Sequence, residues 1–238
     1  MEFAKAVKKP FTDMKALLIG ILLSILPIVR WFTVGYILDN SGVAKNRPAS
    51  SKLHAWDNWG DLFVKGLAAW VISFIYMIPA IFIMLIGVGN LFLSLFKTYV
   101  GGILPTSVLQ DAIVDKEAGA VVAILQQNWA KAIPALINFA PVMIVALLLM
   151  LVAGYLLPVA ILNYIASGKF GEAFSLGKVF KMAFTGEYFF TWVVILIVSM
   201  ILGSILAFIP VIGPAFLLFT LGVFKYTLFG EIHRKLAD

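Results

Sequence analysis

Long apolar stretches without a charged side chain dominate the pattern of this sequence. Three of them cover residues 66–96, 132–168 and 188–224. A helix needs about 20 apolar residues to cross a bilayer core of about 30 Å, so each stretch holds more than one straight span or a bent one. Only helices and closed barrels can span a bilayer, and these unbroken runs lack the alternation of barrel strands. The pattern therefore predicts an all-α, polytopic transmembrane helical bundle.

We expect about six spans, within a range of four to seven. The first covers about residues 16–38 with a kink at Pro27, and the second covers 66–87 and ends in a turn formed by Gly87, Gly89 and Asn90. The span count is least defined over residues 87–110 and 132–166, where Gly and Pro residues can bend or begin a helix. The expected third to sixth spans lie at 91–104, within 132–166, at about 188–208 and at about 215–229, with a compact turn at 209–214 before the last.

The distribution of basic residues favours one orientation. With six spans, the N-terminal lysines, the loop with Lys169, Lys178 and Lys181, and the basic C-terminal tail fall on the same side. Short cytoplasmic loops carry an excess of Lys and Arg. We therefore expect a single integral domain over residues 1–238 in the cell membrane, with both termini in the cytoplasm.

Two segments between the expected spans show helical amphipathicity. In residues 59–70 the apolar positions recur at i, i+3, i+4, i+7, i+8 and i+11, and residues 170–184 carry a similar stripe opposed by polar residues. Such interfacial helices lie in the headgroup plane with one face in the acyl chains. They can act as a lid, a membrane-bending wedge or a lipid-sensing surface, or simply connect two spans.

A weak internal repeat of hairpin units is a second hypothesis about organisation. Tyr36, Tyr99, Tyr164 and Tyr226 are spaced by 63, 65 and 62 residues, each near the end of an apolar stretch. Duplicated hairpins are common in transporters. The alternative is that tyrosines gather at membrane interfaces in any case.

Composition excludes several classes of function. The chain is 62% hydrophobic, 13% charged and free of cysteine, which rules out disulfides and thiolate metal sites. Its formal charge of +6 fits anionic lipid headgroups, and no basic soluble domain suited to nucleic acid is present. With His54 and His233 as the only histidines and no nucleotide-binding or nucleophile motif, we expect no metal, no cofactor and no enzyme activity.

A few polar residues remain as weak functional candidates. Arg30 is the only charge well inside the first expected span, where it could bind a phosphate or reach the interface near Asp39. Asp57 and Asp61 lie four residues apart and could hold a hard cation on one helix face, or mark an interfacial helix start. The remaining candidates are the neighbouring Trp56 and Trp59, which suit headgroup depth, and Asn163, which could face the interior of the bundle.

Two parts of the chain resemble a known family. They are residues 56–67 (WDNWGDLFVKGL) with 75–79 (IYMIP), and residues 158–164 (PVAILNY) with 171–174 (GEAF) and Val179. These stretches resemble DUF4013, an uncharacterised family of prokaryotic, largely archaeal, membrane proteins, although His54-Ala55 stands where Leu-Pro is expected. The resemblance implies a polytopic membrane protein and no catalytic residues.

Two functions remain open from the sequence, and a third, a lipid-modifying enzyme, is disfavoured because no clustered set of Asp, Glu and His lies at membrane depth. The first is a non-catalytic, membrane-organising protein that binds lipids or a partner, in which the amphipathic helices matter most. The second is an oligomeric channel or transporter for a small solute or ion, built from polar groups such as Asn138 and Asn163 and from bent helices. A chain this short usually needs several copies to form a pore, so a homo-oligomer is expected in the second case.

Overall fold

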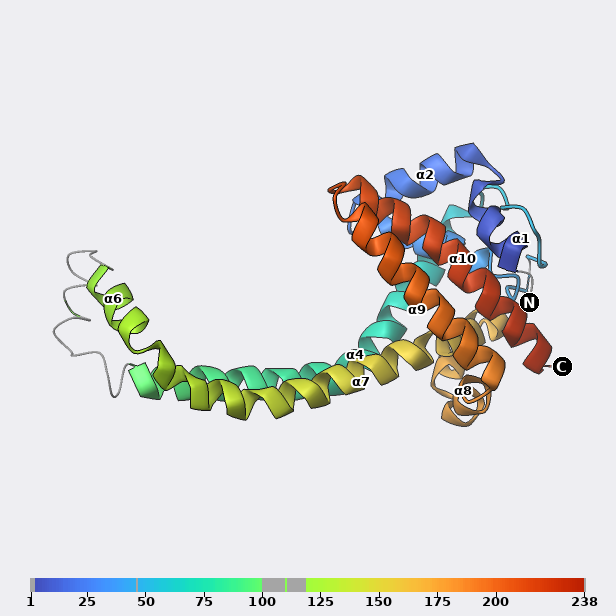
Figure 1. Cartoon of the computed structure of the whole chain (residues 1–238). Coiled ribbons are helices and arrows are strands. Elements are labelled where there is room, and N and C mark those ends of the chain that lie inside the picture. The colour runs from blue at the N-terminus through green and yellow to red at the C-terminus, as the bar shows by residue number, and fades with distance from the viewer. Residues whose placement is uncertain (1–2, 46, 100–109, 111–118, 238) are drawn as a thin grey trace. The chain divides into compact units, whose positions relative to one another are not determined.

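The computed structural model describes residues 3–45, 47–99, 110 and 119–237, and the regular elements in these ranges are helices. Figure 1 shows their arrangement. In chain order they are α1 Phe3–Lys8, η1 Lys9–Phe11, α2 Met14–Ile25, α3 Arg30–Asp39, α4 Trp59–Tyr99, α6 Gly119–Gln127, η2 Trp129–Ala132, α7 Ile133–Ser167, η3 Phe170–Phe174, α8 Leu176–Ala183, α9 Gly186–Leu206 and α10 Ile212–Ala237.

Within the described residues, four helical segments are long and apolar enough to cross a membrane. They are Trp59–Tyr99, Trp129–Ser167, Gly186–Leu206 and Ile212–Leu236. The chain is therefore a helical membrane protein, and its four candidate spans lie at the lower end of the expected range. The last two agree with the expected spans at 188–208 and 215–229. The turn between them covers 207–211, so residues 212–214 of the expected turn at 209–214 belong to α10 instead.

The expected first span at 16–38 is wrong as a single helix. The chain forms α2 and α3 instead, and they are separated at Leu26 to Val29 around Pro27. Proline lacks the backbone N–H and disfavours a helical conformation in the residue before it. Leu26 accordingly has extended backbone angles, and α2 ends there. Asp13 caps the other end of α2, because its side chain accepts a hydrogen bond of 3.0 Å from the backbone N–H of Ala16.

The expected turn at Gly87, Gly89 and Asn90 is also wrong, because α4 continues through these residues to Tyr99. The second expected span and the described part of the third, Leu91 to Tyr99, therefore belong to one helix. Residues 100–104 of the third span lie outside the described residues. Likewise, residues 132–166 lie almost entirely in α7, which is one helix despite its internal prolines.

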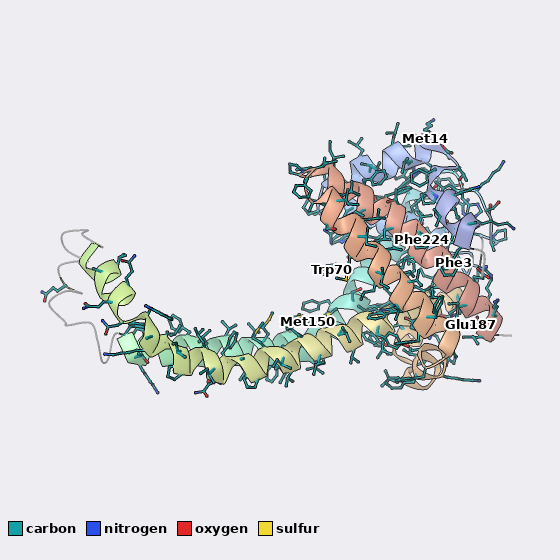
Figure 2. The ribbon with its side chains drawn as sticks, viewed as in Figure 1. Phe3, Met14, Trp70, Met150, Glu187 and Phe224 are labelled. Atoms are coloured by element: carbon teal, nitrogen blue, oxygen red, sulfur yellow. The ribbon has the colours of Figure 1, made fainter. Side chains whose placement is uncertain are left out.

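The described chain divides into two compact units. One comprises Met1–Tyr76 with Ala153–Asp238, and the other comprises Met77–Val152. In the first unit α10 packs against α2, α3 and α9, as the red, blue and orange ribbons of Figure 1 show. Phe219, Leu228 and Phe229 of α10 are buried in this core, whereas Met14 and Trp70 expose apolar side chains (Figure 2). Exposed apolar side chains are expected where lipid is the solvent.

Helices α3 and α4 approach closely in the first unit because glycine occupies both sides of the contact. A Cβ atom on Gly35 would overlap the backbone carbonyl of Leu62, and one on Gly66 would overlap the carbonyl of Trp31. Small residues allow such backbone contact between membrane helices. The pair Gly35 and Gly66 therefore fixes α4 against the short helix that precedes it.

Several hydroxyl side chains within the helices form a hydrogen bond within their own helix. Ser73, Ser199 and Thr220 each donate a hydrogen bond of 2.5–2.7 Å to the carbonyl four residues earlier. This back-bonding removes the cost of a lone hydroxyl in an apolar medium. These residues therefore need no polar partner from another helix.

The second unit contains the C-terminal part of α4, α6, η2 and the N-terminal part of α7, and its two long segments from α4 and α7 pack as a pair. Gly87 lies against Val142 and Phe139 across this pair, and the hydroxyl of Tyr99 donates to the carbonyl of Asn128 at 3.2 Å. Both segments expose many apolar side chains, among them Phe82, Leu85, Phe92, Ile137 and Leu148. Such surfaces suit a bilayer environment.

Candidate functional site

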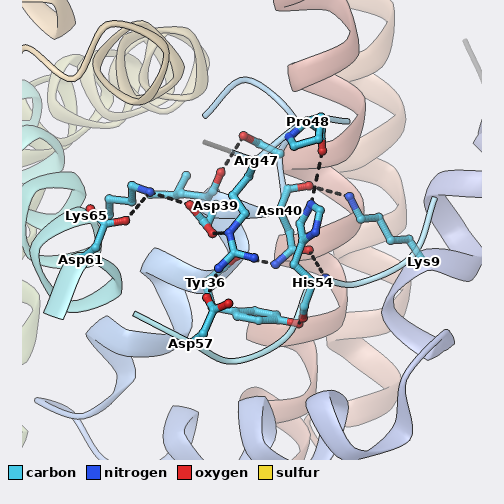
Figure 3. A network of polar contacts seen from close by, with 12 residues as sticks. Lys9, Tyr36, Asp39, Asn40, Arg47, Pro48, His54, Asp57, Asp61 and Lys65 are labelled. Atoms are coloured by element: carbon cyan, nitrogen blue, oxygen red, sulfur yellow. Dashed lines mark hydrogen bonds and ion pairs between the residues drawn. The ribbon is translucent and has the colours of Figure 1, made fainter. Parts of the chain in front are cut away.

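A network of ion pairs connects the loop before α4 to the end of α3 (Figure 3). Asp39 is almost fully buried and lies at its centre, with Nε of Arg47 at 3.0 Å and Nζ of Lys65 at 2.5 Å. Arg47 also pairs with Asp57, and Lys65 pairs with Asp61 at 2.6 Å. The charges alternate along this chain of contacts, so each carboxylate has a cationic partner.

The structure changes the interpretation of Asp57 and Asp61. Because α4 begins at Trp59, Asp57 lies outside the helix and the two carboxylates do not share a helix face. Each is instead paired with a different base, Arg47 or Lys65. No group of three or more His, Asp or Glu side chains suited to a metal ion occurs among the described residues. The network is thus a connection between α3, the loop and α4.

The two tryptophans of this segment form an aromatic stack with Tyr36. Trp56 lies parallel to Tyr36 with ring centroids 3.9 Å apart, and Trp59 lies 5.4 Å from Trp56. Nε1 of Trp56 donates to the carbonyl of Ala16 at 3.2 Å, and the hydroxyl of Tyr36 donates to the carbonyl of His54 at 2.6 Å. Trp56 is therefore partly buried against α2 and α3, while Trp59 remains exposed.

Arg30 and Asn163 lie outside this network. Arg30 is the first residue of α3 and is exposed, and it forms no ion pair within the described residues. It therefore sits at a helix start next to the Pro27 break and not in the middle of a span. Asn163 is in the last two turns of α7, where it lines a separate cavity.

The cavity beside Asn163 has a volume of about 480 Å³ and is formed by α7, η3, α8 and α10. We call it the Asn163 cavity. Oδ1 of Asn163 lies 2.9 Å from Nε2 of His233, and both residues are buried. Since an amide oxygen can only accept, Nε2 of His233 carries the proton. The lining residues are Asn163, Ala166, Ser167, Glu172, Lys178, Lys181, Met182, Thr185, His233 and Leu236.

The amide nitrogen of Asn163 is the unusual atom of this cavity. Nδ2 is buried and has no hydrogen-bond partner among the described residues, and the residue as a whole is 8% exposed. A buried polar atom without a partner costs about 1–3 kcal/mol. The neighbouring hydroxyls are engaged elsewhere, because Ser167 donates to the carbonyl of Asn163 and Thr185 donates to that of Met182. A ligand oxygen in the cavity would supply the missing acceptor.

Basic side chains lie at the rim of the Asn163 cavity. Nζ of Lys178 is 2.9 Å from Glu172. This ammonium and the hydroxyl of Ser175 lower the pKa of Glu172, so the carboxylate stays ionised and neutralises Lys178. Lys181 lines the same cavity and forms no ion pair within the described residues. The rim therefore carries a net positive charge.

Tyrosine hydroxyls hold the segment that forms this rim. Tyr76 donates to the carbonyl of Ala173 at 2.7 Å, and Tyr155 donates to that of Ala183 at 2.5 Å. The expected single helix at 170–184 is instead η3 and α8, separated at Ser175. Ala173, Val179 and Ala183 face the core, whereas Phe180 and Phe184 are exposed. Whether this segment lies on a membrane surface remains a prediction.

A family profile described as a protein of unknown function, DUF4013, matches residues 18–211, most of the chain. The chain belongs to the DUF4013 family. The matched range includes the residues of the Asn163 cavity that precede α10, and it ends before His233. No curated protein matches the chain. No solved structure matches it either.

Several residues of this DUF4013 chain were not singled out as candidates from its sequence. His233 and Lys181 line the Asn163 cavity, and Asp39, Arg47 and Lys65 form the buried ion pairs. A signal existed for Asp39, because it is an acidic residue directly after an apolar stretch. His233 carried no such signal, since its contact with Asn163 arises only when α10 packs against α7.

Proposed function

We propose that the chain is a non-catalytic membrane protein that binds the headgroup of an anionic lipid in the Asn163 cavity. The observation that carries the proposal is that Asn163, which lines a cavity with a basic rim, has a buried Nδ2 without a hydrogen-bond partner among the described residues. A phosphate or glycerol oxygen of a headgroup would accept from Nδ2, and Lys181 would contribute a positive charge. Basic cavities between membrane helices are known binding places for anionic headgroups.

The position of the cavity supports a lipid ligand. It lies at the C-terminal ends of α7 and α10, and these segments are candidate spans, so the cavity is expected near one face of the bilayer. Exposed apolar residues of α8, Leu176 and Phe180, flank the lysines of this helix. An amphipathic segment of this kind can present a basic rim to headgroups while its apolar side chains contact acyl chains.

Native mass spectrometry of the full chain tests this function. The protein would be released from nanodiscs that contain phosphatidylglycerol and phosphatidylcholine, and the bound lipids would be counted. We expect retained phosphatidylglycerol in the wild type and its loss in Asn163→Leu and Lys181→Gln. Lys169→Gln is the matched control, because Lys169 is exposed nearby and does not line the cavity. If the wild type and all variants retained phosphatidylglycerol and phosphatidylcholine to the same extent, the result would contradict the proposal.

An oligomeric channel or transporter is the second candidate. The second unit favours it, because Asn90, Ser94 and Asn138 line a cavity of about 270 Å³ there, and both amides are exposed. Amide side chains in a bilayer gain hydrogen bonds when helices associate. The oligomeric state in mild detergent, measured by light scattering, distinguishes a monomeric lipid-binding protein from an oligomeric channel.

A further inference from the structure

A second cavity of about 410 Å³ lies in the first unit, apart from the residues of the Asn163 cavity. It is formed by α1, η1, the segment after α3 and α10. Its lining residues are Lys5, Ala6, Lys9, Ser41, Ala49, Ser50, Ser51, Thr227, Glu231 and Arg234. We call it the Lys9 cavity. Its volume falls within the range of small-molecule sites, about 300–1,000 Å³.

The charged residues that line the Lys9 cavity are mainly cationic. Lys5, Lys9 and Arg234 contribute three positive charges, and Glu231 contributes the one negative charge. Lys9 is only 1% exposed and has no carboxylate partner within the described part of the chain, which is rare for a buried lysine. Burial, together with the positive charge of Arg234, lowers the pKa of Lys9 to about 8. The fold therefore holds two like charges close together in a partly desolvated place.

The polar side chains that line the Lys9 cavity retain hydrogen-bond donors for a ligand. Nζ of Lys9 donates to the carbonyl of Asn40 at 2.5 Å, and Nη1 of Arg234 donates to the carbonyl of Ser41 at 3.3 Å. An ammonium has three donors and a guanidinium has five, so each retains others. Oγ1 of Thr227 is buried and has no hydrogen-bond partner among the residues that the structure describes. Oγ of Ser50 accepts from the N–H of Lys52, which leaves the hydroxyl proton of Ser50 free to donate.

We propose that the Lys9 cavity is a binding site for a phosphate group, either as free phosphate or as the terminal phosphomonoester of a lipid. A tetrahedral dianion presents several acceptor oxygens to the donors of Lys9, Arg234 and Thr227, and it offsets the repulsion between the buried Lys9 and the partly buried Arg234. Gly42 supports this geometry, because its φ of +81° is suited to glycine and a Cβ atom there would overlap Nη1 of Arg234. A glycine at this position therefore leaves room for the guanidinium.

Binding measurements on the full chain in a neutral detergent test the site. Thermal stability would be followed against inorganic phosphate at constant ionic strength, with chloride as reference, and native mass spectrometry would follow bound phosphatidic acid from nanodiscs. We expect phosphate or phosphatidic acid to bind the wild type, and Arg234→Gln and Lys5→Gln to weaken binding by about tenfold, the effect of one charged hydrogen bond. The milder Ser51→Ala keeps every charge and should weaken binding less.

The controls are Lys235→Gln and Lys8→Gln. Lys235 pairs with Glu187 at 3.6 Å, Lys8 is exposed on α1, and neither lines the cavity. Both should bind as the wild type does. A response to inorganic phosphate identifies free phosphate as a sufficient ligand, and a response to phosphatidic acid alone identifies the lipid. Binding of neither probe, or equal binding in Arg234→Gln and Lys235→Gln, would overturn the proposal. Asn163→Leu changes no residue that lines the Lys9 cavity and Arg234→Gln changes none that lines the Asn163 cavity, so the two sites can fail separately.

Discussion

His233 and Arg234 are consecutive residues of α10, yet their side chains line different cavities. His233 contacts Asn163 in one cavity, and Arg234 contacts the carbonyl of Ser41 beside the other. Neighbouring residues on a helix point about 100° apart, so the last turns of α10 separate the two cavities. A shift or rotation of this end of α10 would alter both.

Replacement of Asp39 by Asn should destabilise the first unit. Arg47 and Lys65 would lose their shared buried carboxylate, so we expect the free energy of unfolding to fall by about 2–3 kcal/mol. Thermal unfolding in detergent measures the change. Asp57→Asn is the control, because this carboxylate is about half exposed and its pairing should contribute at most about 1 kcal/mol. Equal effects of the two substitutions would show that Asp39 is not the centre of the network.

Replacement of Gly35 by Ala should separate α3 from α4. The added methyl group would overlap the carbonyl of Leu62, which is backbone and cannot rotate away, so we expect a loss of about 1–3 kcal/mol in stability. Gly60→Ala serves as the matched control, since nothing lies within 4 Å of its Cβ position. Melting temperatures of the two variants in the same detergent give the comparison. A Gly35→Ala variant as stable as Gly60→Ala would contradict the close approach.

Sulfate affinity at the Lys9 cavity should fall as the pH rises through about 8. Lys9 loses its proton near this pH in the free protein, and a bound anion raises the pKa of Lys9, so the deprotonated site binds more weakly. Sulfate is the probe because its own charge does not change in this range. Lys5, Glu231 and Arg234 also face the cavity, so Lys9→Arg is needed as a control. Arginine stays protonated, and the variant should give a flat profile from pH 7 to 9.

Replacement of Arg30 by Leu should leave membrane insertion intact. The side chain is exposed at the start of α3 and forms no ion pair among the described residues, so its removal breaks no ion pair there. The yield of membrane-inserted protein and its melting temperature measure the outcome. A selective loss of a bound anionic lipid in Arg30→Lys, which lacks the planar guanidinium fork, would instead assign Arg30 to a lipid site.

The sequence predicts the helical membrane class and the last two spans well, because hydrophobic length is a local signal. It does not predict where long apolar stretches break. Pro27 separates two helices, whereas Pro79 lies inside α4. The Gly and Asn residues at 87–90 also stay helical. Each lowers helix stability by only about 1 kcal/mol, whereas backbone N–H and C=O groups left unpaired in an apolar medium cost more.

The candidate sites are even less visible in the sequence. Asp57 and Asp61 stand out because they are close in sequence, yet each is paired with a different base. Lys9 and Arg234 lie at opposite ends of the chain, and only the packing of α10 against η1 brings them to one cavity. Long-range contacts of this kind depend on tertiary structure, which neither periodicity nor spacing contains.

The length of α4 has a consequence for the surrounding bilayer. Residues 66–96 of this helix carry no charge, and at 1.5 Å per residue they rise about 45 Å, against a hydrocarbon core of about 30 Å. Hydrophobic mismatch of this size is relieved by helix tilt, bending or local thickening of the lipid, each at a fraction of a kcal/mol per ångström. The free energy of α4 in the membrane therefore varies with bilayer thickness, and membranes of different thickness should favour different tilt angles of this helix.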